Sequence, residues 1–133
     1  MFCIDASVLL NAFLQEPGSE RSRRFLDRLK ESGERFIVPE LLFPEIAGAL
    51  GRGTKNAILA ERYVATLRTL PGLISITLDA SLADVAATIA ATQRLKGGDA
   101  VYVATAQAFG ATLITLDEEQ YARARIIISA QKP

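Results

Sequence analysis

The sequence predicts a three-layer α/β/α sandwich with a mainly parallel central sheet. Short apolar runs alternate along the chain with longer segments of helical character, which is the pattern of repeated β/α units. The runs "FIV" at 36–38 and "TLITL" at 112–116 are apolar on both faces or nearly so, as in parallel strands covered by helices on each side. No linker, repeat or low-complexity segment divides the 133 residues, so we expect one domain covering 1–133.

Turn formers and helix caps set the order of the elements. We expect Ser19, Thr54 and Ser81 to be helix N-caps, the last of them in the capping-box sequence "SLAD", and Pro39 to open a helix. The predicted strands cover 1–5, 36–38, 73–78, 112–116 and 125–129. The predicted helices cover 6–14, 19–31, 39–50, 54–69, 81–94 and 99–109, with a short helix after Asp117; the breaks between elements fall at Pro17-Gly18, Gly33, Pro71-Gly72, Gly97-Gly98 and Gly110.

Composition excludes several classes of function. Histidine is absent, which rules out Ser-His-Asp and Cys-His catalysis and histidine-ligated zinc. The single Cys3 excludes an internal disulfide, and with no signal peptide or membrane-spanning run it favours a cytoplasmic protein. Fifteen basic residues balance fifteen acidic ones, so any nucleic acid must be bound by a local patch or through metal ions.

Two carboxylates follow predicted strands directly. Asp5 ends the first strand and Asp117 ends "TLITL", and the carboxyl ends of parallel strands lie at the same edge of a sheet. Each residue taken alone is equally well explained as a helix N-cap.

Asp99 begins a helix, "DAVYVATAQAF", that is apolar nearly all round and is therefore predicted to be buried. This helix leads straight into the strand at 112–116 and must run antiparallel to it. Eleven helical residues span roughly 16 Å, about the length of five strand residues. We therefore expect Asp99 and Asp117 to meet at one edge of the sheet.

Glu45 lies inside the apolar stripe of the helix that follows the strand at 36–38, where a solvated glutamate would not be expected. The alternative is a buried salt bridge. Four carboxylates at one edge repel one another, and all-oxygen ligation by carboxylates suits Mg²⁺ or Mn²⁺. Neither a dinucleotide-binding nor a P-loop glycine motif occurs in the chain.

Three ordered segments resemble the PIN domain, the nuclease fold of VapC-type toxins of toxin–antitoxin pairs: "IDASVLL" at 4–10, "VPELLFPEIAGALGR" at 38–52 and "GGDAVYVATAQAFGATLITLD" at 97–117. The resemblance implies a Mg²⁺- or Mn²⁺-dependent endoribonuclease that hydrolyses RNA to a 5′-phosphate and a 3′-hydroxyl, and that is a homodimer inhibited by a cognate antitoxin. It implies that the catalytic and metal-binding residues are Asp5, Glu45, Asp99 and Asp117, supported by the neighbouring hydroxyls of Ser7 and Thr115. The candidate RNA contacts are Arg52, Lys55, Arg94 and Lys96.

The chain departs from the family pattern after the last aspartate, where Glu118-Glu119 stands in place of a basic residue. Glu118 is either an extra metal ligand or a solvated residue at a helix start. The competing function is a PIN-like binding or structural module without turnover. A haloacid-dehalogenase-type phosphatase is disfavoured because it requires a second aspartate where Ser7 stands, and a receiver domain is disfavoured because its paired acidic residues and late lysine are missing.

Apolar residues on the helices at 19–31 and 40–69 outnumber those that one sheet face needs. They predict a surface that pairs with a second copy or with an antitoxin helix, the alternative being ordinary core packing; the residues are Phe25, Leu29, Leu59, Tyr63 and Leu67.

Overall fold

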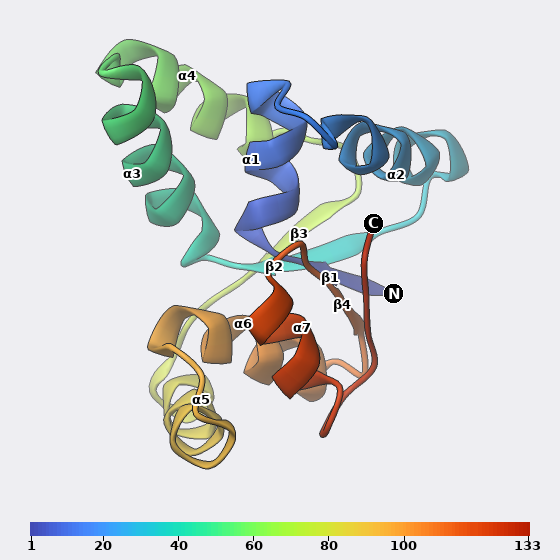
Figure 1. The fold of residues 1–133 in the computed structure, drawn as a ribbon, viewed down its shortest axis with the longest axis vertical. Coiled ribbons are helices and arrows are strands. Elements are labelled where there is room, and N and C mark those ends of the chain that lie inside the picture. The colour runs from blue at the N-terminus through green and yellow to red at the C-terminus, as the bar shows by residue number, and fades with distance from the viewer.

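A computed structural model describes residues 1–133 and confirms the predicted α/β/α sandwich (Figure 1). Five parallel strands form one sheet in the order β3-β2-β1-β4-β5. The strands are β1 (Phe2–Ile4), β2 (Phe36–Pro39), β3 (Leu73–Ile76), β4 (Thr112–Ile114) and β5 (Ala130–Gln131).

Seven helices cover the two faces of the sheet, and Figure 1 shows them as an upper and a lower layer. The upper layer contains α1 (Ala6–Leu14), α2 (Ser19–Ser32), α3 (Leu42–Thr54) and α4 (Ala57–Arg68). The lower layer contains α5 (Ala80–Gln93), α6 (Gly97–Ala108) and α7 (Glu118–Ala124). Helix α6 packs directly against β1, β2 and β4, which explains why every residue from Ala100 to Ala106 is buried.

The register of the central strands places two strand ends level with each other. Ile4 pairs with Ile114 at the ends of β1 and β4, and the next backbone amide, that of Asp5, donates to the Ile114 carbonyl at 2.9 Å. The residues that follow β1 and β4 therefore leave the sheet at the same edge, as the parallel topology predicts.

The helix caps differ from those predicted from the sequence. Ser19 is the first residue of α2 rather than its cap, because Gly18 occupies the cap position in the left-handed region (φ 83°). Asn56, not Thr54, caps α4, and Thr54 instead ends α3. The N-cap of α5 is not Ser81 but Asp79, whose carboxylate accepts from the Leu82 amide at 2.8 Å. At α4 and α5 a residue that caps through its side chain lies two residues from the predicted cap, whereas Gly18 has no side chain with which to cap α2. Local sequence does not rank such neighbours.

Other element boundaries also differ from those predicted, and β4 ends at Ile114 rather than at residue 116. Pro39 ends β2 instead of opening a helix, because β1 pairs with β2 only as far as Ile37 and requires no donor from Pro39. β3 ends at Ile76 rather than at residue 78, and Gly97-Gly98 forms the first turn of α6 rather than a break before it. Residues 125–129 are not a strand, because the amides at 126–128 donate to carbonyls in the last turn of α7; the strand begins at Ala130.

The proposed partner surface is largely core. Phe25, Leu29 and Leu67 are buried in the single apolar core, so that part of the prediction was wrong and core packing explains these residues. Tyr63 is partly buried against the same core, so Leu59, which is 36 % exposed, is the one predicted residue left at the surface. Its neighbour Ile58, which was not predicted, is 64 % exposed. None of the helices has the length and apolar character needed to cross a bilayer.

Candidate active site

Asp5 leaves the end of β1 and caps α1, and it is only 6 % exposed. Its Oδ2 accepts hydrogen bonds from the Ser7 amide at 3.1 Å, from the Ser7 hydroxyl, and from the Thr115 hydroxyl at 3.2 Å. Burial raises the pKa of Asp5 above its ordinary value, and these hydrogen bonds oppose the rise. Asp5 is therefore a helix N-cap, and its role in a metal site stays a prediction.

Glu45 projects from the first turn of α3 toward α6 and is half-buried. Its Oε2 accepts from the Tyr102 hydroxyl at 2.6 Å, while a Cβ on Gly98 would come within 2.8 Å of its Oε1. Burial and the negative charge of Asp5 raise the pKa of Glu45, and the tyrosine hydrogen bond lowers it. No cation forms a salt bridge with Glu45, so a buried ion pair does not explain its position.

Asp99 lies in the first turn of α6, directly before the buried part of that helix. Burial, followed by the charges of Asp5, Asp117 and Glu45, raises the pKa of Asp99 to about 6, and Lys96 partly offsets this. Each of the other three carboxylates is therefore close enough for its charge to raise the pKa of Asp99.

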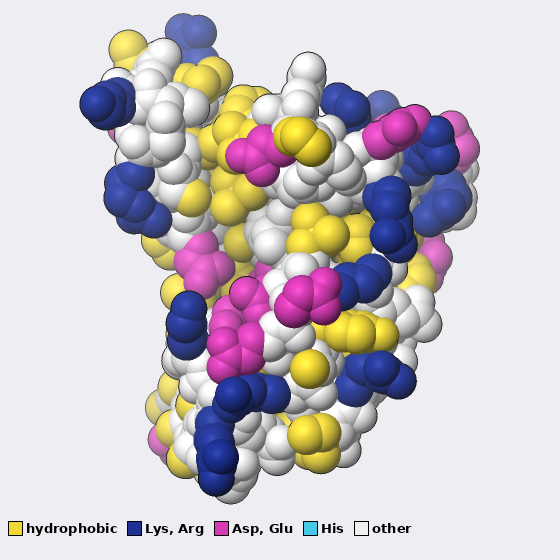
Figure 2. Space-filling view, in the orientation of Figure 1, with side chains coloured by type: hydrophobic (Ala, Val, Ile, Leu, Met, Phe, Trp, Pro, Cys, Tyr) yellow, Lys and Arg dark blue, Asp and Glu magenta, His cyan; other side chains and the backbone are white.

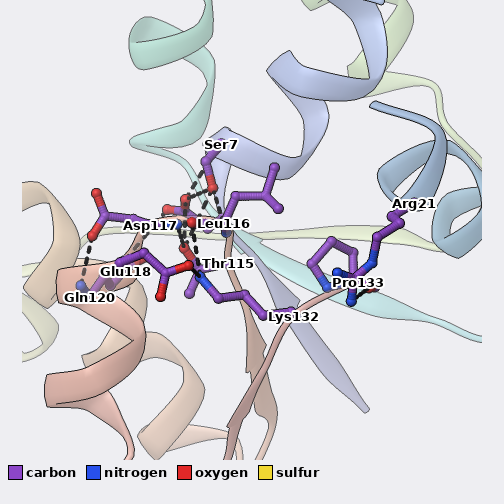
Figure 3. A network of polar contacts seen from close by, with 10 residues as sticks. Ser7, Arg21, Thr115, Leu116, Asp117, Glu118, Gln120, Lys132 and Pro133 are labelled. Atoms are coloured by element: carbon purple, nitrogen blue, oxygen red, sulfur yellow. Dashed lines mark hydrogen bonds and ion pairs between the residues drawn. The ribbon is translucent and has the colours of Figure 1, made fainter. Parts of the chain in front are cut away.

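Asp117 follows β4 and caps α7, with its Oδ1 accepting from the Gln120 amide at 2.7 Å. Its own backbone amide donates to the Thr115 hydroxyl at 3.1 Å, and that hydroxyl also donates to Asp5. Ser7 joins the same network, because its hydroxyl accepts from the Leu116 amide at 3.1 Å (Figure 3). Ser7 and Thr115 thereby connect the ends of β1 and β4 and orient the first carboxylate.

Four elements thus bring four carboxylates to one edge of the sheet. Figure 2 shows Asp and Glu side chains gathered where the upper and lower helix layers meet, with Lys and Arg on both sides. No three acidic side chains are already grouped as ligands of one ion. The donor set nevertheless fits a hard divalent cation, because it consists of carboxylates whose mutual repulsion a bound positive charge would relieve.

Glu118 points away from this cluster. It is 86 % exposed and forms an ion pair with Lys132 at 3.0 Å. Lys132 also donates to the Leu116 carbonyl at 2.9 Å, so its ammonium lies beside the strand end that carries Asp117 (Figure 3). This geometry matches Glu118 as a solvated residue at the start of α7 better than Glu118 as an extra metal ligand.

The predicted basic residues are all exposed, but they are not equally placed. Arg52 lines an open cavity of about 500 Å³ together with Glu45, and its guanidinium lies over Gly48, one turn closer to Glu45. Lys96 precedes α6 and acts electrostatically on Asp99. Lys55 and Arg94 form no ion pair with the carboxylates; both lie at helix ends in left-handed conformations.

Sequence reasoning missed two supporting residues, Tyr102 and Gln120. Both are fully buried polar side chains that contact site carboxylates. A signal for Gln120 was present, because the sequence from Asp117 to Gln120 has the form of a capping box. Nothing local marks Tyr102, whose partner is 57 residues away.

Comparison with known proteins identifies the family to which this fold belongs. The family model described as PIN domain matches residues 2–126. A search of curated protein sequences gives no match.

Several solved structures have the same fold. VapBC2 from Rickettsia felis, bound to a promoter DNA fragment, gives a TM-score of 0.74 at 12 % identity, covering 98 % of this chain and 97 % of that one. VapC20 from Mycobacterium tuberculosis, described as a sarcin-ricin loop cleaving toxin, gives 0.75 at 16 % identity, with 92 % and 94 % covered. FitAcB from Neisseria gonorrhoeae gives 0.72 at 23 % identity, with 98 % and 96 % covered.

Proposed function

This chain belongs to the PIN domain family, and from that premise we propose that it is a divalent-metal-dependent endoribonuclease. The observation that carries the proposal is the position of Asp99. Its pKa is raised to about 6 by burial and by the charges of Asp5, Asp117 and Glu45. Such clustering of like charges opposes folding, and a cation-binding function accounts for it.

Asp5, Glu45, Asp99 and Asp117 are the residues proposed to hold Mg²⁺ or Mn²⁺. A bound ion of this kind neutralises phosphate charge and lowers the pKa of a water that attacks phosphorus. The chain itself supplies orientation: Ser7 and Thr115 hold one oxygen of Asp5, and Tyr102 holds one oxygen of Glu45. Since these hydroxyls donate, they favour the ionised carboxylates that metal binding requires.

The RNA backbone is proposed to lie along the side of the cluster lined by Arg52 and Lys96. Arg52 and Glu45 share the open cavity between α1 and α3, and Lys96 directly precedes the α6 turn that carries Asp99. Two cations beside the acidic cluster suit a phosphodiester that must approach four negative charges. Lys55 and Arg94, which form no ion pair with the carboxylates, remain candidate RNA contacts. RNA as substrate would place the protein in the cytoplasm.

We also propose that the protein is the toxin of a type II toxin–antitoxin pair and forms a homodimer. The proposal is supported by structural neighbours described as VapBC and as toxin–antitoxin complexes, which share the fold along nearly the whole chain. Exposed Ile58 and Leu59 at the start of α4 offer apolar surface to a partner. Light scattering on the purified chain, alone and co-expressed with the adjacent small open reading frame, tests both partners; a monomer unaffected by that product contradicts them.

Cleavage of single-stranded and structured RNA by the purified chain tests the main proposal. We expect cleavage with Mg²⁺ or Mn²⁺, none with EDTA, and none from the Asp99→Asn variant purified in parallel. The parallel variant is the control for contaminating nuclease. Specific binding of RNA without cleavage under any metal would instead support the PIN-like binding module.

A further inference from the structure

Gln120 is the one residue whose contacts reach three of the four site carboxylate residues. It lies in α7 with an exposed fraction of 0 %. Its side-chain Nε2 donates to Oδ1 of Asp5 at 3.5 Å and to the backbone carbonyl of Asp99 at 3.3 Å. Its backbone amide donates to Oδ1 of Asp117 at 2.7 Å.

The side-chain contacts of Gln120 complement those of the hydroxyls. Ser7 and Thr115 both donate to Oδ2 of Asp5, whereas Gln120 donates to Oδ1. The two oxygens of Asp5 are thus held by different elements, one by α1 and the segment after β4 and the other by α7. The second N–H of the same amide ties this carboxylate to the first turn of α6.

The other half of the Gln120 amide is left without a partner. Oε1 is buried and accepts no hydrogen bond. The amide cannot be turned to improve this, because both groups facing Nε2 are acceptors and would then face an oxygen. A buried, unpaired carbonyl destabilises a fold, and an apolar side chain of the same size would avoid the penalty.

We propose that Gln120 is a positioning residue that sets the spacing of Asp5, Asp99 and Asp117 for metal binding. The inference rests on the proposed metal-dependent function and assigns to Gln120 no contact with substrate. A residue that only filled space at this position would not need an amide. The two N–H donors of the amide hold Asp5 and the Asp99 backbone, and the unpaired Oε1 is present because every amide carries an oxygen.

The test replaces Gln120 by Met, which keeps the length and most of the volume of the side chain but removes both donors and the unpaired acceptor. Mn²⁺ affinity is measured by calorimetry, metal-free stability by urea unfolding, and RNA cleavage by steady-state kinetics. We expect Mn²⁺ to bind about 10- to 100-fold more weakly, which is the usual effect of losing a group that orients a metal ligand. We expect kcat to fall while KM for RNA stays within about twofold, because Gln120 is buried away from RNA.

Metal-free stability separates positioning from packing. Met removes one unpaired buried oxygen but also takes a donor from Oδ1 of Asp5 and from the Asp99 carbonyl. These effects on stability oppose each other, so the urea midpoint should change little while metal affinity falls. Gln107→Met is the matched control, because Gln107 is an exposed glutamine of α6 and should change neither property. If Gln120→Met does not fold, Gln120→Leu provides the same loss of donors with a different shape.

Each outcome bears on a different proposal. Wild-type Mn²⁺ affinity and kcat in a folded Gln120→Met variant would overturn the role of Gln120 while leaving the nuclease proposal intact. Absence of Mn²⁺ binding to the unsubstituted protein would overturn the metal-dependent function and the role of Gln120 together. A loss of stability with unchanged metal affinity would assign Gln120 to packing alone.

Discussion

The Tyr102 hydroxyl donates a 2.6 Å hydrogen bond to Oε2 of Glu45, joining α6 to α3 across the edge of the sheet. Tyr102 is fully buried, and burial together with the charges of Asp5 and Glu45 raises its pKa above the ordinary tyrosine value. The tyrosine hydroxyl therefore stays protonated at neutral pH and remains a donor. This hydrogen bond lowers the pKa of Glu45, against the rise that burial and the charge of Asp5 cause.

Replacing Tyr102 by Phe should weaken the protein and its metal site together. The Glu45 carboxylate loses its donor, so its pKa rises further and the ionised form becomes less available to a metal. We expect a loss of about 1 to 2 kcal/mol in the free energy of unfolding, measured with urea, and weaker Mn²⁺ binding by calorimetry.

Tyr63→Phe is the matched control for that substitution. The Tyr63 hydroxyl donates to the Leu9 carbonyl at 3.2 Å, away from the carboxylates. Its removal should lower stability by about 1 kcal/mol and leave Mn²⁺ affinity unchanged. Equal effects of both variants on metal binding would contradict a specific role for Tyr102.

Asp99→Asn should stabilise the metal-free protein in a pH-dependent way. The folded-state pKa of about 6 lies above the ordinary value of 3.8, so the folded protein binds the proton more tightly than the unfolded chain. Stability associated with Asp99 is therefore fully present below about pH 4 and is lost as the pH rises through 6. Asn avoids that loss, and we expect a gain of about 1 kcal/mol at pH 7, or a few degrees in Tm, after allowance for solvent screening of this half-buried group.

The difference between Asp99→Asn and the unsubstituted protein should disappear at about pH 4, where both side chains are neutral. Mg²⁺ should reverse the order at pH 7, because only the unsubstituted protein gains stability from binding it. Asp84→Asn, an exposed position on α5, is the control and should have no effect. A pH-independent Tm difference would show that charge crowding is not the cause.

Glu118→Gln should leave Mn²⁺ affinity and cleavage nearly unchanged, whereas Asp117→Asn should lower both. Glu118 is exposed and paired with Lys132, while Asp117 acts on Asp99. Asn caps helices about as well as Asp, so the fold should survive the second substitution. Calorimetric titration of the two variants side by side makes the comparison, and a loss of affinity in Glu118→Gln would make that residue a ligand.

Arg52→Ala and Lys96→Ala should raise KM for RNA with a smaller change in kcat. Each removes one cation next to the carboxylates, and each lost phosphate contact should reduce the salt dependence of RNA binding by a slope of about 0.7. Lys55→Ala and Arg94→Ala are the comparison pair and should have smaller effects. Equal effects of all four would indicate a diffuse basic surface rather than contacts beside the site.

The sequence by itself determined the parallel α/β fold and the edge at which Asp5, Asp99 and Asp117 meet. This was possible because strand ends, helix lengths and the alternation of elements are local properties, and topology converts them into position. Glu45 was found for the same reason, since a carboxylate inside an apolar helix stripe is visible in the sequence. The prediction of helix caps failed where two possible capping residues lie within one turn, as Asp79 and Ser81 do.

Only the tertiary structure showed that Tyr102 and Gln120 support the carboxylates, whereas Ser7 and Thr115 were expected from the sequence. Tyr102 lies 57 residues from Glu45 and Gln120 lies 115 residues from Asp5, so neither contact leaves a local pattern. The position of Lys132 next to Asp117 likewise depends on how β5 pairs with β4. These contacts form when separate layers pack together, and the packed geometry, rather than the order of residues, determines which donor faces which carboxylate.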